Sequence, residues 1–188
     1  MLDSLGHRRV AVLDGGLTAW VAAGFELTTS IPALPPARLE LAGAWTRVID
    51  RDQLRARLGE VVLLDARAVP RYRGEVEPVD PVAGHIPTAR SAPTDGNLRP
   101  DGRFLPPAEL RARFAALGAG AGGGDPAGAA RQPVVTSCGS GTSACHHALA
   151  MRLAALPDPI LYPGSWSDWS TAGYPVATGP EPGDPSPG

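Results

Sequence analysis

The sequence contains no lysine, because all 17 basic residues among its 188 are arginines. A Schiff base on a lysine and a phosphate loop of the Walker type are therefore excluded. Charged residues make up only 19% of the chain, and the net charge of -2 gives no electrostatic reason to expect a nucleic-acid partner. Enzymes that use a Schiff-base lysine or a Walker phosphate loop are therefore not expected, and neither is a nucleic-acid partner.

Cysteine is scarce as well, with Cys138 and Cys145 the only two. Two cysteines are too few for a disulfide framework in a chain of this length, so a reducing compartment is the simpler expectation. The opening stretch MLDSLGHRRV lacks the apolar core of a signal peptide, and no run approaches the roughly 18 apolar residues of a membrane span. We expect a soluble, cytoplasmic protein with no membrane partner.

Short apolar runs alternate with helical patterns along most of the chain. Strands are expected at residues 61–64 and 133–137, and helices at 51–58, 107–117 and 142–156, the first of them capped by Asp50. Strand, helix, strand and helix in this order predict an α/β domain with a mainly parallel sheet. Ligands of such sheets bind beyond the carboxyl ends of the strands.

Three stretches have the composition of linkers or loops. They are the Pro-rich residues 31–36, the Gly/Ala run 118–130 and the tail 179–188. We expect little packed structure in any of them.

One segment is repeated within the chain. VLDGGLTAWVAAGFELTT at 12–29 resembles ILYPGSWSDWSTAGYPVAT at 160–178, with two glycines and one tryptophan in matching order. Each copy predicts a strand, a glycine turn and a short aromatic helix, so each has the form of a domain's end. The chain has room for one complete domain, and we therefore expect residues 1–30 to be the remnant of a preceding one. Chance similarity between two generic segments is the alternative.

The most informative segment is PVVTSCGSGTSAC, in which Cys138 follows a predicted buried strand and precedes a helix. Glycines at 139 and 141 allow a tight curl, so that the amides of residues 139–143 can point at the sulfur, aided by the positive end of the helix. Such a ring of N–H donors favours an anion. We expect an accessible Cys138 thiolate, held at the head of the helix as a nucleophile.

Other uses of this cysteine are less well supported. Phosphatases of the tyrosine type need an arginine six residues after the cysteine to grip phosphate, and Ala144 stands there. The spacing of Cys138, Cys145, His146 and His147 does not match a zinc site, so no metal is expected. A buried structural thiol is the remaining alternative for Cys138, and Cys145 is expected to be a packing residue. The two histidines are expected to be packing residues or solvent contacts.

The sequence resembles the rhodanese family of sulfurtransferases. The motifs that carry the resemblance are CGSGTSA at 138–144, LLDAR at 63–67, AGHIPTA at 83–89 and LYPGSWSDW at 161–169. The resemblance implies a rhodanese-like catalytic domain at 46–178, with helices on both faces of the sheet. It further implies a linker at 31–45, a disordered tail at 179–188, and a remnant strand and helix of a first rhodanese-like domain at 1–30.

The resemblance also implies a reaction. Cys138 would take a sulfane sulfur from a small-molecule donor, become a persulfide, and pass the sulfur to cyanide or a thiol, without metal or organic cofactor. Within the family a Gly-Ser-Gly loop goes with 3-mercaptopyruvate and a basic loop with thiosulfate. The loop here is of the first type, but both donors stay open.

Candidate site residues follow from the same motifs. Substrate binding is expected from Arg71, which matches an arginine for the donor's carboxylate, and from Gly139, Ser140, Gly141, Thr142 and Ser143. Ser140 could bond the keto group or relay a proton. Supporting roles are expected for Asp65, Arg67, Arg73 and His85, although the first two commonly fix loops by ion pairing and His85 commonly serves turn backbone groups.

The sequence departs from the family pattern at three places. Val79 stands where a second carboxylate-binding arginine would be, which weakens the case for 3-mercaptopyruvate as the donor. Thr88 replaces the glycine of GHIPGA and Thr142-Ser143 replaces a common Val-Thr pair, and both changes are expected to be tolerated. The competing interpretation is a non-catalytic rhodanese-like binding or regulatory module, made inactive by loss of the first domain. The apolar surface left by that loss could support self-association.

Overall fold

The computed structural model describes residues 2, 5–7, 9–38, 40, 46–120 and 132–185. Most of the Gly/Ala run, the end of the predicted linker and residues 186–188 lie outside this set. The chain divides into two compact units, Met1–Thr46 with Leu98–Phe104, and Arg47–Asn97 with Leu105–Gly188. Each unit is described by itself.

The larger unit is built on a parallel sheet of four strands. In the order of the sheet they are β2 (Arg90–Ser91), β1 (Val62–Asp65), β3 (Val134–Ser137) and β4 (Ile160–Leu161). The register places Asp65 beside Ser137, so β1 and β3 end side by side. The predicted α/β fold with a parallel sheet is confirmed, and Cys138 follows at that carboxyl edge.

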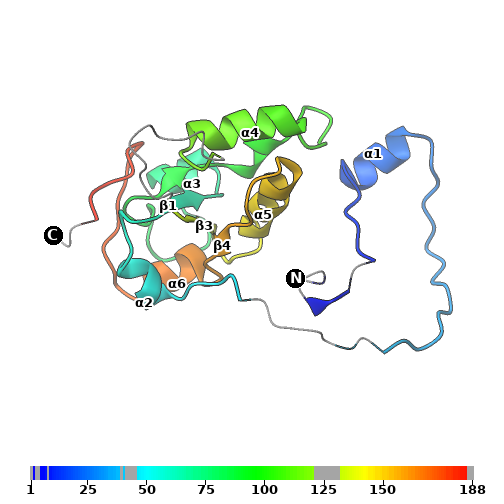
Figure 1. Ribbon diagram of the computed structural model, residues 1–188, viewed down its shortest axis with the longest axis horizontal. Coiled ribbons are helices and arrows are strands. Elements are labelled where there is room, and N and C mark those ends of the chain that lie inside the picture. The colour runs from blue at the N-terminus through cyan, green and yellow to red at the C-terminus, as the bar shows by residue number, and fades with distance from the viewer. Residues whose placement is uncertain are drawn as a thin grey trace. The chain divides into compact units, whose positions relative to one another are not determined.

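Helices cover both faces of this sheet (Figure 1). The helices of the unit are α2 (Arg51–Arg55), α3 (Val69–Arg73), α4 (Pro107–Ala116), α5 (Ala144–Leu153) and α6 (Ser165–Thr171). Helices α4 and α5 pack against each other on one face, and α2 and α6 lie on the other. None of the described helices has the length and apolar character needed to cross a membrane.

The core on the α6 face is aromatic. Trp166 and Trp169, both at most 1% exposed, pack with alternate residues of the central strands such as Leu63 and Val135. Successive strand residues point to opposite faces, so Leu64 and Val134 serve the α4 and α5 face instead. Because β1 and β3 are buried along their whole length, each begins with consecutive apolar residues, at 62–64 and 134–135, rather than with an alternating pattern.

Local signals set the helix ends. The Asp50 carboxylate accepts a hydrogen bond from the Gln53 amide at 2.8 Å, and the Gln53 side chain accepts one from the Asp50 amide. This reciprocal cap fixes the start of α2 where the sequence predicts it. The helix is shorter than the predicted 51–58, because the chain turns from Ala56 towards Gly59, which has φ of 84°.

The smaller unit contains helix α1 (Gly16–Ala22), in the first copy of the sequence repeat. The expected remnant helix is therefore present, but the expected strand before it is not, since residues 9–13 pair with no strand in the described chain. A strand needs a neighbour to satisfy its backbone groups, and this unit provides none. No side chain of α1 is buried, and Leu17 and Val21 are more than half exposed.

Residues 176–183, which we call the C-terminal strap, cross the turn at 84–89. His85 and Ala177 exchange backbone hydrogen bonds of 2.8 and 2.9 Å, and the Thr88 amide donates to the Pro182 carbonyl at 2.6 Å. The composition of residues 179–188 predicts a disordered tail, whereas the structure holds residues 179–183 against this turn. Backbone pairing with the turn, which composition does not encode, accounts for the difference.

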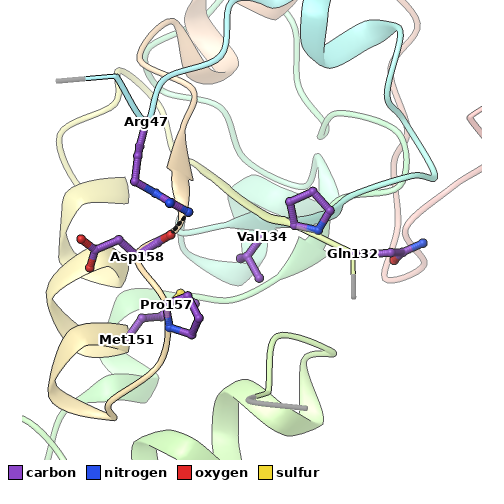
Figure 2. A pocket seen from close by; sticks show the side chains of 7 residues that line it. Arg47, Gln132, Val134, Met151, Pro157 and Asp158 are labelled. Carbon is purple, nitrogen blue, oxygen red and sulfur yellow. Dashed lines mark hydrogen bonds between the residues drawn. The ribbon is translucent and has the colours of Figure 1, made fainter. Parts of the chain in front are cut away.

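A cavity of about 110 Å³ lies at the amino end of β3 (Figure 2). Its lining comes from Arg47, Gln132, Pro133, Val134, Met151, Pro157 and Asp158. The Arg47 guanidinium donates to the Asp158 carbonyl. None of these is a predicted site residue, since Cys138 lies at the opposite edge of the sheet.

Replacing Thr88 by glycine should stabilise the fold. Thr88 has φ of 70°, a left-handed conformation that is unfavourable for a β-branched residue, and its buried hydroxyl has no hydrogen-bond partner in the described chain. We expect Thr88→Gly to raise the free energy of unfolding by about 1 kcal/mol, measured by urea titration. Gly84→Ala is the opposing control, because its Cβ would lie 2.5 Å from the Ala177 carbonyl oxygen and should destabilise. A stability that is lower in Thr88→Gly would contradict the argument.

Acid should destabilise the protein through His147. This side chain is fully buried against Phe114, and burial lowers the pKa of His147 to about 3. The unfolded chain takes up this proton below about pH 6.5, so the free energy of unfolding should fall between pH 6.5 and 3, with about 2 kcal/mol lost by pH 5. His147→Leu should remove that share of the pH dependence in denaturant titrations at pH 7 and 5. An equal loss of unfolding free energy between pH 7 and 5 in the two proteins would contradict this assignment.

Candidate active site

The backbone of Cys138 is fixed from the start of helix α6. The Cys138 amide donates to Ser165 Oγ at 3.0 Å, and the Cys138 carbonyl accepts from the Trp166 amide at 3.0 Å. Ser165 Oγ in turn donates to the Tyr162 carbonyl at 2.9 Å. Ser165 adopts φ of 53°, so its own backbone is held in an unfavourable conformation to reach this position. The cysteine is therefore anchored on both sides of its Cα.

The loop after the cysteine keeps its amides free. None of the backbone N–H groups of residues 139–143 donates a hydrogen bond to any group in the described part of the chain. Gly141 has φ of 80°, and a Cβ there would lie 2.6 Å from the Pro163 carbonyl oxygen. Glycine is thus required at 141 both by conformation and by space.

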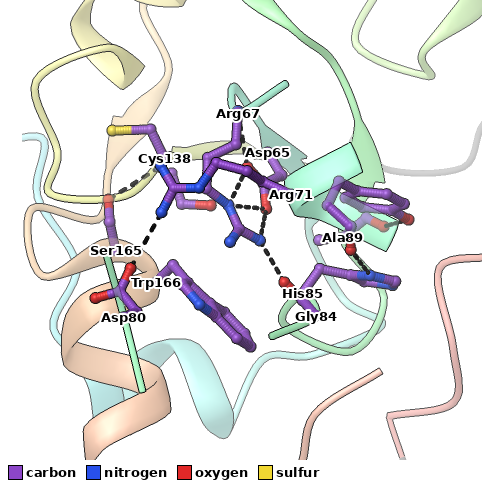
Figure 3. Close-up of polar contacts among 12 residues, drawn as sticks. Asp65, Arg67, Arg71, Asp80, Gly84, His85, Ala89, Cys138, Ser165 and Trp166 are labelled. Atoms are coloured by element: carbon purple, nitrogen blue, oxygen red, sulfur yellow. Dashed lines mark hydrogen bonds and ion pairs between the residues drawn. The ribbon is translucent and has the colours of Figure 1, made fainter. Parts of the chain in front are cut away.

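Access to the sulfur is narrower than the sequence predicts. Cys138 is only 3% exposed, whereas Ser140, Thr142 and Ser143 of its loop are exposed. The expectation of an openly accessible thiol is therefore wrong, because the loop closes around the residue that it serves. Figure 3 shows that Sγ points away from the Asp65–Arg67 pair, so the thiol does not belong to that network.

Arg67 is the centre of a buried polar network. Its side chain is 2% exposed and binds Asp65 at 2.8 Å, the Gly84 carbonyl at 2.6 Å and Glu77 at 3.3 Å. The guanidinium also lies over the Trp166 ring, 4.6 Å from its centroid. Asp65 and Arg67 therefore fix loops, the commoner of the two roles weighed from the sequence.

Arg71 lies beside the cysteine loop. A Cβ built on Gly139 would be 3.5 Å from Arg71 Nη1, so helix α3 brings this guanidinium to the loop. The same guanidinium is already paired with Glu77 at 2.6 Å and with Asp80 at 3.2 Å. The arginine singled out from the sequence is thus in place, but two carboxylates hold it.

The other two supporting candidates lie outside this cluster. Arg73 is 43% exposed and pairs at 3.6 Å with the exposed Glu75. His85 is fully buried, stacks on Tyr72 with 3.8 Å between ring centroids, and lies 2.7 Å from the Tyr72 carbonyl and 3.0 Å from the Glu181 carbonyl. Burial lowers the pKa of His85 below its usual value. Its contacts serve the turn and the C-terminal strap.

The sequence reasoning missed Ser165, Glu77 and Asp80. Glu77 and Asp80 have side chains only 4% and 6% exposed. Burial opposes ionisation of Glu77, but hydrogen bonds from Arg71 and from the amides of Asp80 and Val79 outweigh it and lower the pKa of Glu77. The available signal was the spacing in RYRGEVEPVD at 71–80, where three acids follow two arginines within ten residues.

Cys145 does not pack in the core as expected. It is exposed, and its thiol donates to the Gly141 carbonyl at 3.5 Å. Partial burial raises the pKa of Cys145, which keeps this second thiol protonated. Within the described residues, no group of three or more histidine, cysteine, aspartate or glutamate side chains is arranged to hold a metal.

The family model for the rhodanese-like domain matches residues 50–172. The chain belongs to the rhodanese family. A relative from Pseudomonas aeruginosa named "Probable 3-mercaptopyruvate sulfurtransferase" is 50% identical over 186 residues, which cover 95% of this chain and 62% of that protein. The thiosulfate sulfurtransferase of Cricetulus griseus is 35% identical over 178 residues, covering 90% of this chain and 56% of that protein.

Solved structures agree with this membership. The 3-mercaptopyruvate sulfurtransferase from Leishmania major matches with a TM-score of 0.67 at 30% identity, over 92% of this chain and 46% of that one. This rhodanese chain therefore spans roughly half to two thirds of the length of the relatives named here.

Two glycines of the loop should respond differently to alanine. Gly141→Ala forces a left-handed alanine against Pro163, so we expect it to distort the loop and to lower the free energy of unfolding by about 2 kcal/mol. Gly139→Ala is the matched control, because its Cβ would make only ordinary contact with Arg71. Urea titration and the alkylation rate of Cys138 by iodoacetamide measure the two effects. Equal behaviour of the two variants would refute the geometric distinction.

Proposed function

We propose that this rhodanese is a sulfurtransferase in which Cys138 carries the transferred sulfur. The observation that supports it most is the set of free amides at residues 139–143, which follow a thiol whose backbone is anchored by Ser165 and Trp166. Free N–H donors at the head of a helix stabilise an anion, whether thiolate, persulfide or the donor's charged group. Arg71, beside Gly139, adds the nearby cation.

The proposed reaction has two halves. The Cys138 thiolate attacks the sulfur of 3-mercaptopyruvate, the carbon–sulfur bond breaks, and the carbon takes up a proton to give pyruvate. The sulfur stays on Cys138 as a persulfide. Cyanide or a thiol then attacks the outer sulfur, which leaves as thiocyanate or a new persulfide and restores the Cys138 thiolate. Ping-pong kinetics follow from this double displacement.

The loop favours 3-mercaptopyruvate over thiosulfate as the donor. Residues 139–143 include no cation, and the guanidinium that borders them is already paired with Glu77 and Asp80. A singly charged donor is more easily accommodated there than a doubly charged one. Exposed Ser140 is placed to bond the keto group or to relay the proton, and Thr142 and Ser143 complete the anion-binding loop.

Incubation with each donor should add the mass of one sulfur atom to Cys138. We expect the peptide that contains Cys138 to gain this mass with 3-mercaptopyruvate, and to a smaller extent with thiosulfate. Cyanide should remove it and release thiocyanate. Cys138→Ser should abolish the gain, while Cys145→Ser, the matched control, should retain it.

A folded protein in which neither donor modifies Cys138 would favour the non-catalytic binding module. In that case self-association of the chain would be tested next, by light scattering against protein concentration.

A further inference from the structure

The donors of Arg71 are unevenly occupied. Glu77 binds the side of the guanidinium, accepting from Nε at 3.3 Å and from Nη2 at 2.6 Å. Asp80 accepts from Nη2 at 3.2 Å. Nη1 donates to no group in the described chain, and this nitrogen is the one nearest to Gly139. Glu77 therefore orients the guanidinium, and Nη1 faces the cysteine loop.

Asp80 occupies the position that a second carboxylate would need. An incoming carboxylate that binds end-on uses one hydrogen of Nη1 and one of Nη2. Glu77 and Asp80 between them engage Nη2, so such a group meets Nη1 alone unless Asp80 moves. Asp80 thus competes with an anionic donor for the same arginine.

The net charge of the ion-pair cluster around Arg67 and Arg71 also disfavours an anionic donor. Arg67 and Arg71 are surrounded by three carboxylates, those of Asp65, Glu77 and Asp80, so the cluster carries a net charge of -1. The side chains of the three acids are only 2–6% exposed, and salt screens buried charges weakly. An anion that approaches the loop beside Gly139 therefore meets excess negative charge.

We infer that Asp80 is a specificity-determining residue that selects singly charged sulfur donors against doubly charged ones. The inference rests on the proposed function and concerns the same site. Asp80 acts by holding Nη2 of Arg71 and by contributing the charge that makes the cluster negative. Repulsion scales with the charge of the donor, so thiosulfate is penalised twice as strongly, in free energy, as 3-mercaptopyruvate.

Asp80→Asn tests this directly. The asparagine side chain keeps the shape and one acceptor but removes the charge. We take a unit charge several ångströms away to weaken the binding of a monoanion about threefold. Removing that charge should then improve kcat/KM about threefold for 3-mercaptopyruvate and about tenfold for thiosulfate. The ratio of the two donors should therefore shift about threefold towards thiosulfate. The gain should appear mainly in KM, because the charge acts on binding.

The matched control is Asp158→Asn. Asp158 also pairs with an arginine, Arg152 at 2.5 Å, but lies at the opposite edge of the sheet. We expect its donor ratio to stay at the wild-type value. A donor ratio that is unchanged in Asp80→Asn, or that shifts equally in both variants, would overturn the role assigned to Asp80.

A second measurement separates this inference from the proposed function. Sulfate and acetate, which transfer no sulfur, should slow alkylation of Cys138 by iodoacetamide when they occupy the loop. In Asp80→Asn the half-protecting concentration should fall about tenfold for sulfate and about threefold for acetate, whether or not the protein turns over a donor. Unchanged protection would sink the inference, whereas absent persulfide formation with shifted protection would sink only the enzymatic function.

Discussion

The buried guanidinium of Arg67 joins most of the segments that surround the site. It binds Asp65 at the end of β1, Glu77 in the following loop and the Gly84 carbonyl in the turn, and it covers the Trp166 ring of α6. Removing the guanidinium would leave the buried Asp65 carboxylate without a cation in the described chain, a change that typically costs about 3–5 kcal/mol. Glu77 would keep its pair with Arg71. These buried contacts hold the end of β1, the loop with Glu77, the turn with Gly84 and helix α6 in fixed positions.

The cysteine loop depends on this frame but is built differently. Its geometry rests on two hydrogen bonds to the Cys138 backbone, which involve the Ser165 hydroxyl and the Trp166 amide. The amides that follow have no partner in the part of the chain that the structure describes. Because most residues of the loop are exposed, water can satisfy these amides until an anion displaces it. Rigid surroundings let it keep that arrangement, since the neighbouring helix α6 is packed through two tryptophans.

Much of this could be predicted from the sequence. Buried strands, capped helices and the Cys-Gly-x-Gly loop follow from local patterns, and they located the site at the carboxyl edge of the sheet. The roles of Ser165 and Asp80 could not be predicted, because each depends on a contact that only the folded chain creates. The strand expected before α1 was wrong for a related reason, since a strand requires a neighbour that a single segment cannot provide.

The C-terminal strap has a consequence for how the protein is made. Residues 177–182 close the turn that supplies the Gly84 carbonyl to Arg67, yet they are separated from that turn by about half of the chain. During translation, β1, β3 and the cysteine loop leave the ribosome before the strap does. A nascent chain can therefore pair β1 with β3 before the strap is available, and the turn at 84–89 gains its backbone hydrogen bonds to the strap in a later step.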